Sequence, residues 1–361
     1  MTAMEELKNI ASKFAIKGSV VDIKPLGSGL INDTFFVKAD SGEDYVLQKI
    51  NTAIFKDPEL LQSNIVAVTD HLRKKLSGDP EVGRKVLKFL QVKDGGKTWL
   101  QDGDGGCWRM SVYIRDSYTH DTVNPEYSYY AGRAFGEFES MLSDLDAPLG
   151  ETIPDFHNME LRARQLQEAI SADAAGRLSN PEVQALLDEM LPLSGPMCKA
   201  EALYNQGLLP KRICHCDTKV NNILFDADGN ILCVIDLDTV MPGFVFSDFG
   251  DFMRTAANNA AEDEPDTSKV TFNMDIYKAF TKGYLETATF LTPVEIEHLP
   301  YAALRFAYMQ AVRFLADYIN GDTYYKIANP EHNLVRTKAQ MALYRSIESH
   351  YSEMMDYLNI K

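Results

Sequence analysis

Four polar side chains that could carry out chemistry lie between residues 217 and 236 of the sequence. Asp217, Lys219 and Asn222 follow one another closely, and Asp236 comes after a second apolar run. A carboxylate together with an amide oxygen is a hard-oxygen pair that suits Mg²⁺, and a separate carboxylate can accept the proton of an attacking hydroxyl. Asn222 and Asp236 are therefore candidate metal ligands and Asp217 is a candidate general base. Lys219 could offset negative charge in a transition state.

A strand–turn–strand pattern is expected to position these residues. Residues 222–225 and 231–235 are apolar and strand-like, and the Asp-Ala-Asp-Gly-Asn sequence of 226–230 is typical of a turn. In a hairpin the first residue of one strand lies about 5 Å from the last residue of the other. The pattern therefore predicts that Asn222 and Asp236 lie side by side at its open end, with Asp217 in the loop that leads into it.

His215, Asp217 and Asn222 have the spacing of the catalytic loop in kinase-like phosphotransferases. Transfer of the γ-phosphoryl group of ATP requires in-line positioning and charge neutralisation, which these side chains and a Mg²⁺ ion could supply. The alternative is a surface loop whose polar residues cap turns. Zinc binding by Cys214, His215 and Cys216 is disfavoured, because adjacent side chains of an extended segment point in opposite directions.

A glycine-containing turn near the N-terminus is the candidate phosphate-binding loop. Gly27, Ser28 and Gly29 lie between the first two expected strands, and glycine lets backbone N–H groups approach phosphate oxygens closely. A plain tight turn would have a similar sequence. We assign this loop to the nucleotide because of the cluster around Asp217 further along the chain.

Two further segments are expected to hold the nucleotide. Alternation along the third strand places Gln48 where a kinase-like fold carries a base, and Lys49 on the opposite face. Lys49 is a candidate ligand of the phosphates if the strand bulges, and a solvent-exposed lysine is the alternative. Backbone groups between residues 113 and 116 are expected to pair with adenine, so Tyr113 and Arg115 are included among the candidate cofactor-binding residues.

The order of strand and helix patterns predicts an α+β chain with two lobes. A small β-rich lobe, residues 1–115, would bind ATP, and a larger, mostly helical lobe, residues 116–361, would carry the catalytic loop and the substrate site. The first residues are expected to form an amphipathic helix with Ile10 and Phe14 facing inward. Strands are expected at 20–23, 35–37, 45–47, 86–92, 99–100 and 108–114. Helices are expected at 58–76, 158–173, 181–206, 273–287, 293–319 and 334–358, and from Tyr127 onward.

Composition and charge narrow the class of partner. Hydrophobic residues make up 45% and charged residues 24% of the 361 residues, which is ordinary for a globular protein. The formal net charge of −16 disfavours nucleic acid and anionic membrane as partners, and no apolar run reaches the roughly 20 residues of a membrane helix. Five cysteines without regular spacing, and an acidic N-terminus without an apolar signal segment, predict a cytoplasmic protein with reduced thiols. Its partners would be ATP, Mg²⁺ and a small molecule.

The chain resembles the aminoglycoside phosphotransferase/choline kinase superfamily and, within it, the N-acetylhexosamine 1-kinase branch. The similar blocks span nearly the whole chain, at 27–32, 47–55, 215–224, 235–243, 248–251, 313–324 and 330–337. The resemblance implies a two-lobed protein-kinase-like fold and transfer of phosphate from MgATP to the anomeric hydroxyl of N-acetylglucosamine or N-acetylgalactosamine. It also implies that Gln48 is tolerated in place of a base and that Arg313 and Tyr324 contact the sugar. Asn32 and Asp217 are assigned to the substrate as well.

Several assignments have an alternative. Arg313 could form a structural ion pair with Asp317, one helical turn away, and Asp248 could either hydrogen-bond the catalytic loop or cap the following helix. Leu30, where the branch has a histidine, and Thr255 differ from the branch on the sugar side. The alternative functions are a kinase of the same superfamily for another small alcohol, such as homoserine, choline, ethanolamine or another sugar, and a catalytically inactive nucleotide-binding module.

Overall fold

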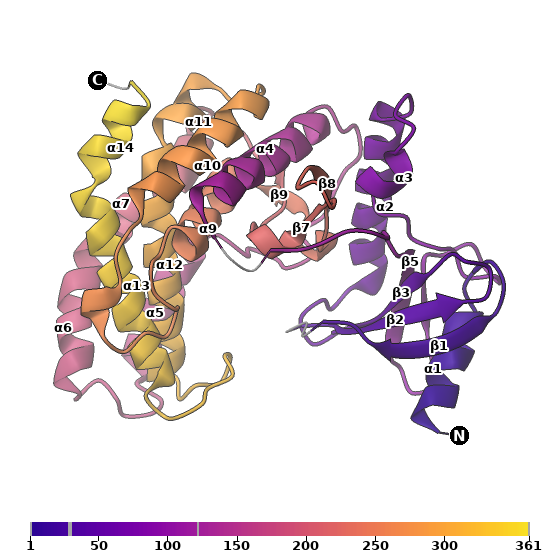
Figure 1. Cartoon of the computed structure of the whole chain (residues 1–361). Helices are drawn as coiled ribbons and strands as arrows, with labels where there is room; N and C mark the ends of the chain where they lie inside the picture. Colours follow the sequence, from indigo (N-terminus) through magenta and orange to yellow (C-terminus); the bar gives the residue numbers. More distant parts are fainter. Residues whose placement is uncertain (1, 28–30, 121–122, 360–361) are drawn as a thin grey trace. The chain divides into compact units, whose positions relative to one another are not determined.

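The protein is described by a computed structural model that covers residues 2–27, 31–120 and 123–359 (Figure 1). The chain forms two compact units, of which the first contains Met1–Thr119, Asp144–Pro154 and Ile223–Met241 and the second contains His120–Ser143, Asp155–Asn222 and Pro242–Lys361. The first unit is rich in strands and the second is mostly helical, which confirms the predicted α+β class. The division into lobes at residues 115 and 116 stays a prediction.

The first unit is built on a five-stranded antiparallel sheet with the strand order β1-β2-β3-β5-β4. The strands are β1 (Val20–Pro25), β2 (Asp33–Ala39), β3 (Tyr45–Ile50), β4 (Trp99–Gln101) and β5 (Cys107–Val112). Three helices accompany them, α1 (Ala3–Ser12), α2 (Pro58–Lys75) and α3 (Val82–Lys85). Tyr45 and Leu47 of β3 are buried while the intervening Val46 and the following Gln48 are partly exposed, as the two-residue period of a strand requires.

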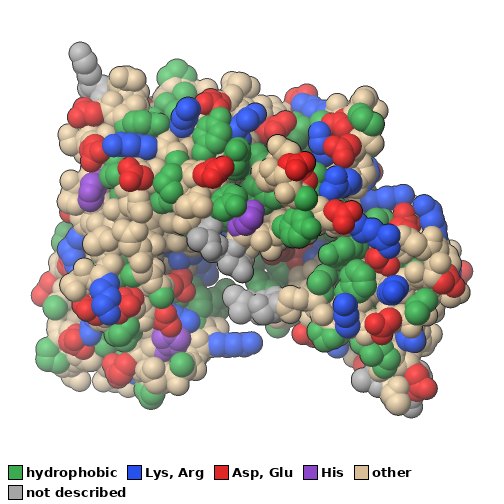
Figure 2. Space-filling model, in the orientation of Figure 1, with side chains coloured by type: hydrophobic (Ala, Val, Ile, Leu, Met, Phe, Trp, Pro, Cys, Tyr) green, Lys and Arg blue, Asp and Glu red, His purple; other side chains and the backbone are tan. Residues whose placement is uncertain are grey.

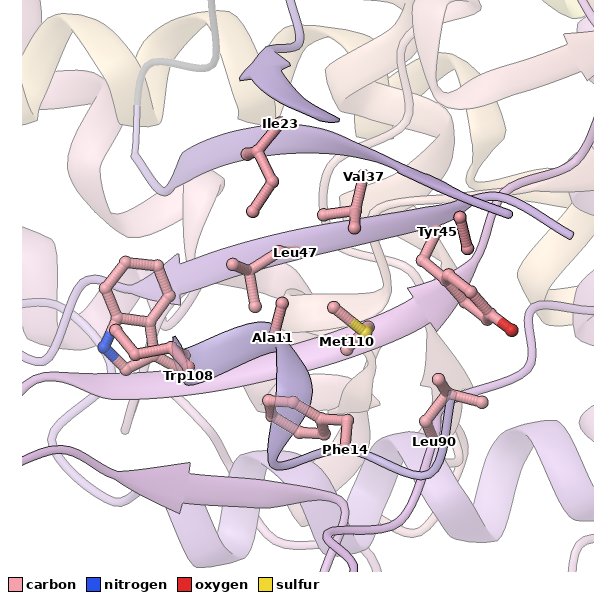
Figure 3. Packing of buried hydrophobic residues seen from close by; sticks show 11 residues of the cluster. Ala11, Phe14, Ile23, Val37, Tyr45, Leu47, Leu90, Trp108 and Met110 are labelled. Carbon is pink, nitrogen blue, oxygen red and sulfur yellow. The ribbon is translucent and has the colours of Figure 1, made fainter. Parts of the chain in front are cut away.

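One face of this sheet carries a hydrophobic core cluster of the first unit (Figure 3). The strands contribute Ile23, Val37, Tyr45, Leu47, Trp108 and Met110. These side chains pack against α1 and the residues that follow it, including Ala11 and Phe14. The predicted inward orientation of Ile10 and Phe14 is confirmed, because both are buried in this cluster.

The strand predicted at 86–92 is not formed. This stretch makes isolated bridges, such as the one between Phe89 and Ser111. It also exchanges two backbone bonds with β5, from the Leu90 N–H to the Met110 carbonyl at 2.8 Å and from the Val112 N–H to the Lys88 carbonyl at 2.9 Å. β4 already pairs with residues 107–109 of β5, so only the last part of that strand edge is left for another partner. The apolar pattern of the stretch reflects the burial of side chains such as Leu90 rather than a ladder of backbone bonds.

The predicted hairpin is present as β7 (Ile223–Phe225) and β8 (Ile231–Val234). Ile223 pairs with Val234, and the turn is closed by the Asp226 carboxylate, which accepts two backbone N–H groups at 2.9 and 2.8 Å. Such bonds from a side chain to the backbone explain why Asp favours turns. In the chain, Asn222 directly precedes the first strand and Asp236 follows the second, so both flank the open end.

The second unit is built mainly from helices. They are α4 (Pro125–Leu142), α5 (Met159–Ala172), α6 (Pro181–Met190), α7 (Ser194–Met197), α8 (Lys199–Asn205), α9 (Val245–Ala256), α10 (Met274–Thr287), α11 (Pro293–Glu297), α12 (Leu299–Ile319), α13 (His332–Ser349) and α14 (Tyr351–Tyr357). β6 (Arg212–Cys214) and β9 (Met241–Gly243) form a two-stranded sheet. The continuous helices expected at 181–206, 293–319 and 334–358 are each divided. Pro192, Pro196 and Pro300 lie near two of these breaks, and proline lacks the N–H that a helix interior needs.

α4 and α10 lie side by side and approach each other more closely than side chains normally allow (Figure 1). A Cβ atom added to Gly132 on α4 would lie 2.2 Å from the Phe280 carbonyl oxygen, and one added to Gly283 on α10 would lie 2.1 Å from the Tyr129 carbonyl oxygen. Both distances are far below van der Waals contact, so glycine is required at both positions. The contact fixes α4, which in turn packs against the catalytic loop.

Charged side chains of both signs share the visible surface. On the face drawn in Figure 2, Asp and Glu are intermixed with Lys and Arg over the strand-rich and the helical parts alike. Within the part of the chain that the structure describes, no helix combines the length and the apolar character needed to cross a membrane.

Candidate active site

Asp248 on α9 holds the backbone of the catalytic loop. Its two carboxylate oxygens accept the N–H groups of His215 and Cys216 at 2.6 and 2.7 Å, and its carbonyl accepts the Thr218 hydroxyl at 2.6 Å. These bonds satisfy buried N–H groups that would otherwise be costly. The residue at the N-cap of α9 is Phe244. Of the two roles considered for Asp248, bonding to the catalytic loop is confirmed and capping is wrong.

The His215 side chain is buried and lies edge-on to two aromatic rings of α4. Its ring centroid is 5.4 Å from that of Phe135 and 5.9 Å from that of Phe138. Burial raises the pKa of the neighbouring Cys214 and Cys216 thiols well above the ordinary value. The thiolate and not the thiol is the metal-binding form, so burial disfavours metal binding by these two cysteines.

Asp217, Lys219 and Asn222 are brought together on this loop. The Lys219 ammonium lies 2.5 Å from Asp217 Oδ1, and the Asn222 amide donates to the Asp217 carbonyl at 2.8 Å and to Oδ2 at 3.3 Å. Cys216 has a left-handed φ of +61°, which turns the chain sharply just before Asp217. The Asp217 side chain is 23% exposed, so an incoming hydroxyl can reach its carboxylate.

A second acid lies behind the loop. Glu139 on α4 is buried and accepts the Tyr284 hydroxyl at 2.6 Å. Burial raises the pKa of Glu139 well above its usual value, and the charge of Asp248 raises it further. Burial also raises the pKa of Asp248, against the opposing effects of His215 and the two loop N–H groups. Because both Asp248 oxygens accept N–H groups of the loop, which favours the charged form of Asp248, we assign the proton of this pair to Glu139.

Glu139→Gln is expected to flatten the pH dependence of stability. Because the folded-state pKa of Glu139 lies above the unfolded value of 4.5, the folded protein keeps a proton that the unfolded chain has lost. The parent should therefore lose stability as the pH rises above 4.5, by up to about 1.4 kcal/mol per pH unit until Glu139 ionises. Glutamine has the hydrogen-bonding shape of a protonated glutamate and no proton to lose.

Urea unfolding between about pH 5 and pH 9 measures this slope. Glu137→Gln, an exposed position on the same helix, is the matched control and should keep the slope of the parent. A Glu139→Gln variant whose slope equals that of the control would contradict the assignment of the proton.

Asp251, one turn after Asp248 on α9, extends the charged groups of the site. It is buried and pairs with Arg254 at 2.9 Å, and Arg254 pairs with Glu262 at 2.6 Å. Burial raises the pKa of Asp251, the Arg254 charge opposes this increase, and the Asp217 charge adds to it. The carboxylates of Asp217 and Asp251 therefore interact through space, and Arg254 offsets their repulsion.

Arg313 on α12 lies in an aromatic cage. Its guanidinium carbon is 5.6, 5.9 and 5.6 Å from the ring centroids of Phe156, Tyr324 and Tyr325. A guanidinium is attracted to the face of an aromatic ring. Tyr324 is 67% exposed, so this wall of the cage faces solvent. The two residues implied as sugar contacts, Arg313 and Tyr324, are thus neighbours in the structure.

The alternative ion pair between Arg313 and Asp317 is wrong. Asp317 accepts the backbone N–H groups of residues 323–325 at 2.9, 2.8 and 3.0 Å and the Asn333 amide at 2.9 Å. Arg313 donates to Gln310 Oε1 at 2.6 Å instead. The oxygens of Asp317 are taken by these N–H donors, so this carboxylate organises the loop that carries Tyr324.

Arg162 on α5 is a second guanidinium in the same region. It donates to Gln165 and to the carbonyls of Asp155 and Phe156. Burial lowers the pKa of Arg162 to about 10, and the charge of Arg313 contributes to the decrease. Across residues 31–120 and 123–359, neither Arg162 nor Arg313 forms an ion pair with a carboxylate. This region therefore carries positive charge that no acid of the described chain pairs with directly.

The candidate phosphate loop connects β1 to β2. Gly27 has a left-handed φ of +70°, and apart from its chain neighbours no atom of the described residues lies within 4 Å of the position that a Cβ would take. A phosphate could therefore approach the backbone closely at this residue. Ser28 and Gly29, and also Leu30, which differs from the hexosamine branch, lie outside the described residues.

Gln48 occupies the position on β3 where a kinase-like fold carries a basic residue. β3 pairs with β5 in an unbroken register, so no bulge turns Lys49 to that face. The Lys49 side chain is exposed, with its ammonium 5.5 Å from the Trp108 ring centroid, and its contact with the phosphates stays a prediction. Gln48 lies opposite Arg109 of β5 and accepts its Nε–H at 2.9 Å, and Arg109 also pairs with Asp238 at 2.5 Å.

Arg109 was not among the residues that the sequence identified. The sequence does contain an indication of its role: Arg109 lies within the apolar run of β5, and an arginine that is buried in a strand requires a partner. The partner, Asp238, lies far along the chain, so sequence proximity gave no indication of it.

Asn32 has both ends of its amide engaged within the first unit. Its Nδ2 donates to Asp238 Oδ2 at 2.7 Å, and its Oδ1 accepts the Asn51 N–H at 2.9 Å. The main chain of Asp238 is held as well, since its carbonyl accepts the Thr152 hydroxyl at 2.8 Å. Asn32 therefore braces the loop where it enters β2, and its assignment to the substrate stays a prediction.

Tyr113 and Arg115 both contact Asp44. The Tyr113 N–H donates to the Asp44 carbonyl at 2.9 Å, and the Arg115 guanidinium pairs with the Asp44 carboxylate at 2.5 Å. The carbonyls of Arg115 and Asp116 accept Arg84 at 3.3 and 3.1 Å. These bonds order the segment locally, and its contact with adenine stays a prediction.

Asp236 lies between β8 and a 3₁₀ helix, Leu237–Thr239. It has φ +58° and ψ +58°, in the left-handed region. A residue other than glycine keeps this conformation where the surrounding structure holds it, and such positions cluster at functional sites. Its role as a metal ligand stays a prediction.

Comparison with known proteins identifies a protein family for this chain. A model of the phosphotransferase enzyme family matches residues 22–276 of the chain. The chain belongs to this family. The matched range includes the glycine loop of this phosphotransferase, its catalytic loop, the β7–β8 hairpin and Asp248.

Solved structures share the fold of this phosphotransferase. An aminoglycoside phosphotransferase from Alicyclobacillus acidocaldarius has a TM-score of 0.62 at 12% identity, over 97% of this chain and 96% of that one. The microcompartment-associated aminopropanol kinase has 0.58 at 15% identity, over 97% and 98%. A spectinomycin phosphotransferase in complex with ADP and spectinomycin has 0.57 at 11% identity, over 98% of both chains. The predicted protein-kinase-like fold is confirmed.

Proposed function

We propose that this phosphotransferase moves the γ-phosphoryl group of ATP to a neutral sugar. The proposed acceptor is the anomeric hydroxyl of N-acetylglucosamine or N-acetylgalactosamine, and the product is the 1-phosphate. The observation that carries the proposal is the catalytic loop, in which Asp217, Lys219 and Asn222 share one site. The family match supports the reaction type, and the resemblance of the sequence to the hexosamine branch supports the sugar.

In the proposed reaction Asp217 acts as the general base. The acceptor oxygen bonds to the γ-phosphorus, the bridging P–O bond to the β-phosphate breaks, and ADP leaves while the hydroxyl proton passes to the Asp217 carboxylate. Lys219, which pairs with Asp217 at 2.5 Å, can turn toward the transferred oxygens as negative charge develops on them. Asn222 keeps Asp217 oriented through its amide.

Asn222 and Asp236 are the residues that would hold Mg²⁺. The Asn222 amide nitrogen donates a hydrogen bond to Asp217, so the side-chain oxygen of Asn222 is the atom available to a cation. An amide oxygen and a carboxylate are ligands that Mg²⁺ accepts, and the two residues flank the open end of the same hairpin in the chain. When bound, the ion offsets charge on the nucleotide phosphates.

The positive charge around Arg313 favours a neutral acceptor over an amine. Arg162 and Arg313 lie close enough for their charges to interact, and an ammonium group would be repelled between them. Guanidinium groups donate to the hydroxyl and carbonyl oxygens that an N-acetylhexosamine presents. The exposed ring of Tyr324 offers an apolar face to a sugar ring. Choline, ethanolamine and aminopropanol therefore fit this region less well than a sugar.

Acceptor choice is tested by measuring ADP release with ATP, Mg²⁺ and one acceptor at a time. We expect turnover with N-acetylglucosamine or N-acetylgalactosamine, and little with galactose, choline, ethanolamine or homoserine. Turnover on choline or homoserine, with none on either N-acetylhexosamine, would overturn the proposal. Nucleotide binding without ATP consumption on any acceptor would favour an inactive binding module.

Arg313→Gln is expected to raise the KM for the sugar about 10- to 150-fold, with a much smaller effect on the KM for ATP. A hydrogen bond from a charged donor contributes about 1.5–3 kcal/mol, which corresponds to this range. The measurement is initial ADP release as a function of each substrate. Arg345→Gln, which breaks an exposed ion pair with Glu189, is the control and should leave both constants unchanged. A parental KM for the sugar in Arg313→Gln would remove this residue from the sugar site.

A further inference from the structure

We propose that Arg109 is a positioning residue for metal-bound nucleotide, and that it acts through its buried ion pair with Asp238. Gln48 stands at the position where a kinase-like fold carries that base, and Arg109 lies directly opposite it on β5. The inference rests on the proposed use of MgATP and is independent of which acceptor is phosphorylated.

The guanidinium of Arg109 is fixed by partners within the first unit. Arg109 is 2% exposed and Asp238 is 3% exposed. Arg109 Nη1 lies 2.5 Å from Asp238 Oδ1, and Arg109 Nε donates to Gln48 Oε1 at 2.9 Å. The Gln48 amide in turn donates to the Thr34 hydroxyl at 3.2 Å. A buried pair with additional hydrogen bonds is held in one geometry, and removing either partner leaves an uncompensated charge.

Asp238 connects this pair to the glycine-containing loop and to the segment of Thr152. Its second carboxylate oxygen accepts the Asn32 amide at 2.7 Å, at the end of the glycine-containing loop. Its carbonyl accepts the Thr152 hydroxyl at 2.8 Å. One residue thus ties β5, the loop between β1 and β2, and the turn that carries Asp236.

Asp236, two residues before Asp238, needs such support. Its left-handed backbone, with φ +58°, persists only where neighbouring contacts over-determine it. The contacts of Asp238 supply that restraint, and Arg109 orients the Asp238 carboxylate. Arg109 therefore helps to hold the backbone turn that carries the Asp236 side chain. It acts through Asp238, so it is a positioning residue and not a ligand of the nucleotide.

The test measures nucleotide affinity without any acceptor. The full chain and its variants are titrated calorimetrically with AMP-PNP, once with Mg²⁺ and once with EDTA. Arg109→Lys and Asp238→Asn should weaken binding in Mg²⁺ about 10- to 100-fold, the range found when residues that orient a metal ligand are replaced. Binding in EDTA should stay close to that of the parent. Arg109→Met should lose more than Arg109→Lys, which keeps the charge.

Arg73→Lys is the matched control. Arg73 on α2 is a partly buried arginine of the same unit that donates to the Val86 carbonyl at 2.6 Å. It should leave both affinities unchanged. Parental binding by Arg109→Lys in Mg²⁺, or an equal loss with and without Mg²⁺, would overturn the proposal, because a merely structural defect does not depend on the metal. Failure of the proposed function appears separately, as a parent that does not bind AMP-PNP or that releases no ADP with any acceptor.

Discussion

Asp217→Asn is expected to lower kcat by about 10²- to 10⁴-fold, the contribution of a positioned general base. Asparagine has the shape of aspartate and can still accept the Asn222 amide, but it cannot take up a proton and it loses the ion pair with Lys219. The change therefore removes the chemistry and preserves the loop. It is measured as ADP release at saturating ATP and N-acetylglucosamine, and nucleotide affinity should stay at the parental value.

Asp228→Asn provides the control for this variant. Asp228 is an exposed aspartate in the turn of the β7–β8 hairpin, so its replacement changes the net charge equally without entering the loop. It should have the kcat of the parent. If Asp217→Asn kept more than about one-tenth of the parental kcat, general-base catalysis by Asp217 would be excluded.

Asp236→Asn is expected to raise the Mg²⁺ concentration for half-maximal rate about 100-fold or more, and to lower kcat as well. Replacement of groups that only support a metal ligand already costs about 10- to 100-fold, and this change removes the negative charge of a ligand itself. Asparagine tolerates the left-handed backbone of this position, so the turn is preserved. The measurement is the initial rate as a function of Mg²⁺ at constant ATP.

Asp173→Asn is the control for Asp236→Asn. Asp173 also has a left-handed backbone, with φ +38°, but it ends α5 in the second unit and is not part of the β7–β8 hairpin. Its variant should have the Mg²⁺ dependence of the parent. A parental Mg²⁺ dependence in Asp236→Asn would show that this carboxylate does not bind the metal.

The parts of the site that were predictable from the sequence are those whose contacts are local. Asp217 and Asn222 are five residues apart and hydrogen-bonded. The hairpin that follows is specified by two apolar runs and by the Asp226 turn. The α+β class followed from periodicity for the same reason, because strand and helix patterns extend over neighbouring residues.

The partners of Arg109 and Arg313 could not be predicted from the sequence, because they depend on contacts between residues that the fold brings together. Arg109 and Asp238 are 129 residues apart, so the composition of β5 indicated only that its arginine needs a partner. Asp317 was a plausible partner for Arg313 by helical spacing, but the N–H groups of residues 323–325 compete for it more effectively. Neither the pairing of Arg109 with Asp238 nor the competition for Asp317 can be evaluated before the chain is folded.

Two kinds of secondary-structure prediction were wrong: one strand whose partner edge was already partly occupied, and helices that are interrupted in the structure. The stretch at 86–92 has the composition of a strand, but β4 had already taken part of the β5 edge that it would need. The helices predicted at 181–206 and 293–319 have continuous periodicity, yet they contain prolines at which the backbone restarts. Burial pattern alone does not distinguish a continuous helix from two helices that share a buried face.

The hydrogen bonds between Asp248 and the catalytic loop also have a consequence for folding. The carboxylate reaches the His215 N–H from a residue 33 positions further along the chain. Until α9 forms and docks, the N–H groups of residues 215 and 216 lack the carboxylate that accepts them in the folded protein. The reactive geometry of the catalytic loop therefore depends on a helix that lies outside the loop's own segment of the chain. A chain that stops between these two segments would contain Asp217, Lys219 and Asn222 and would leave them unassembled.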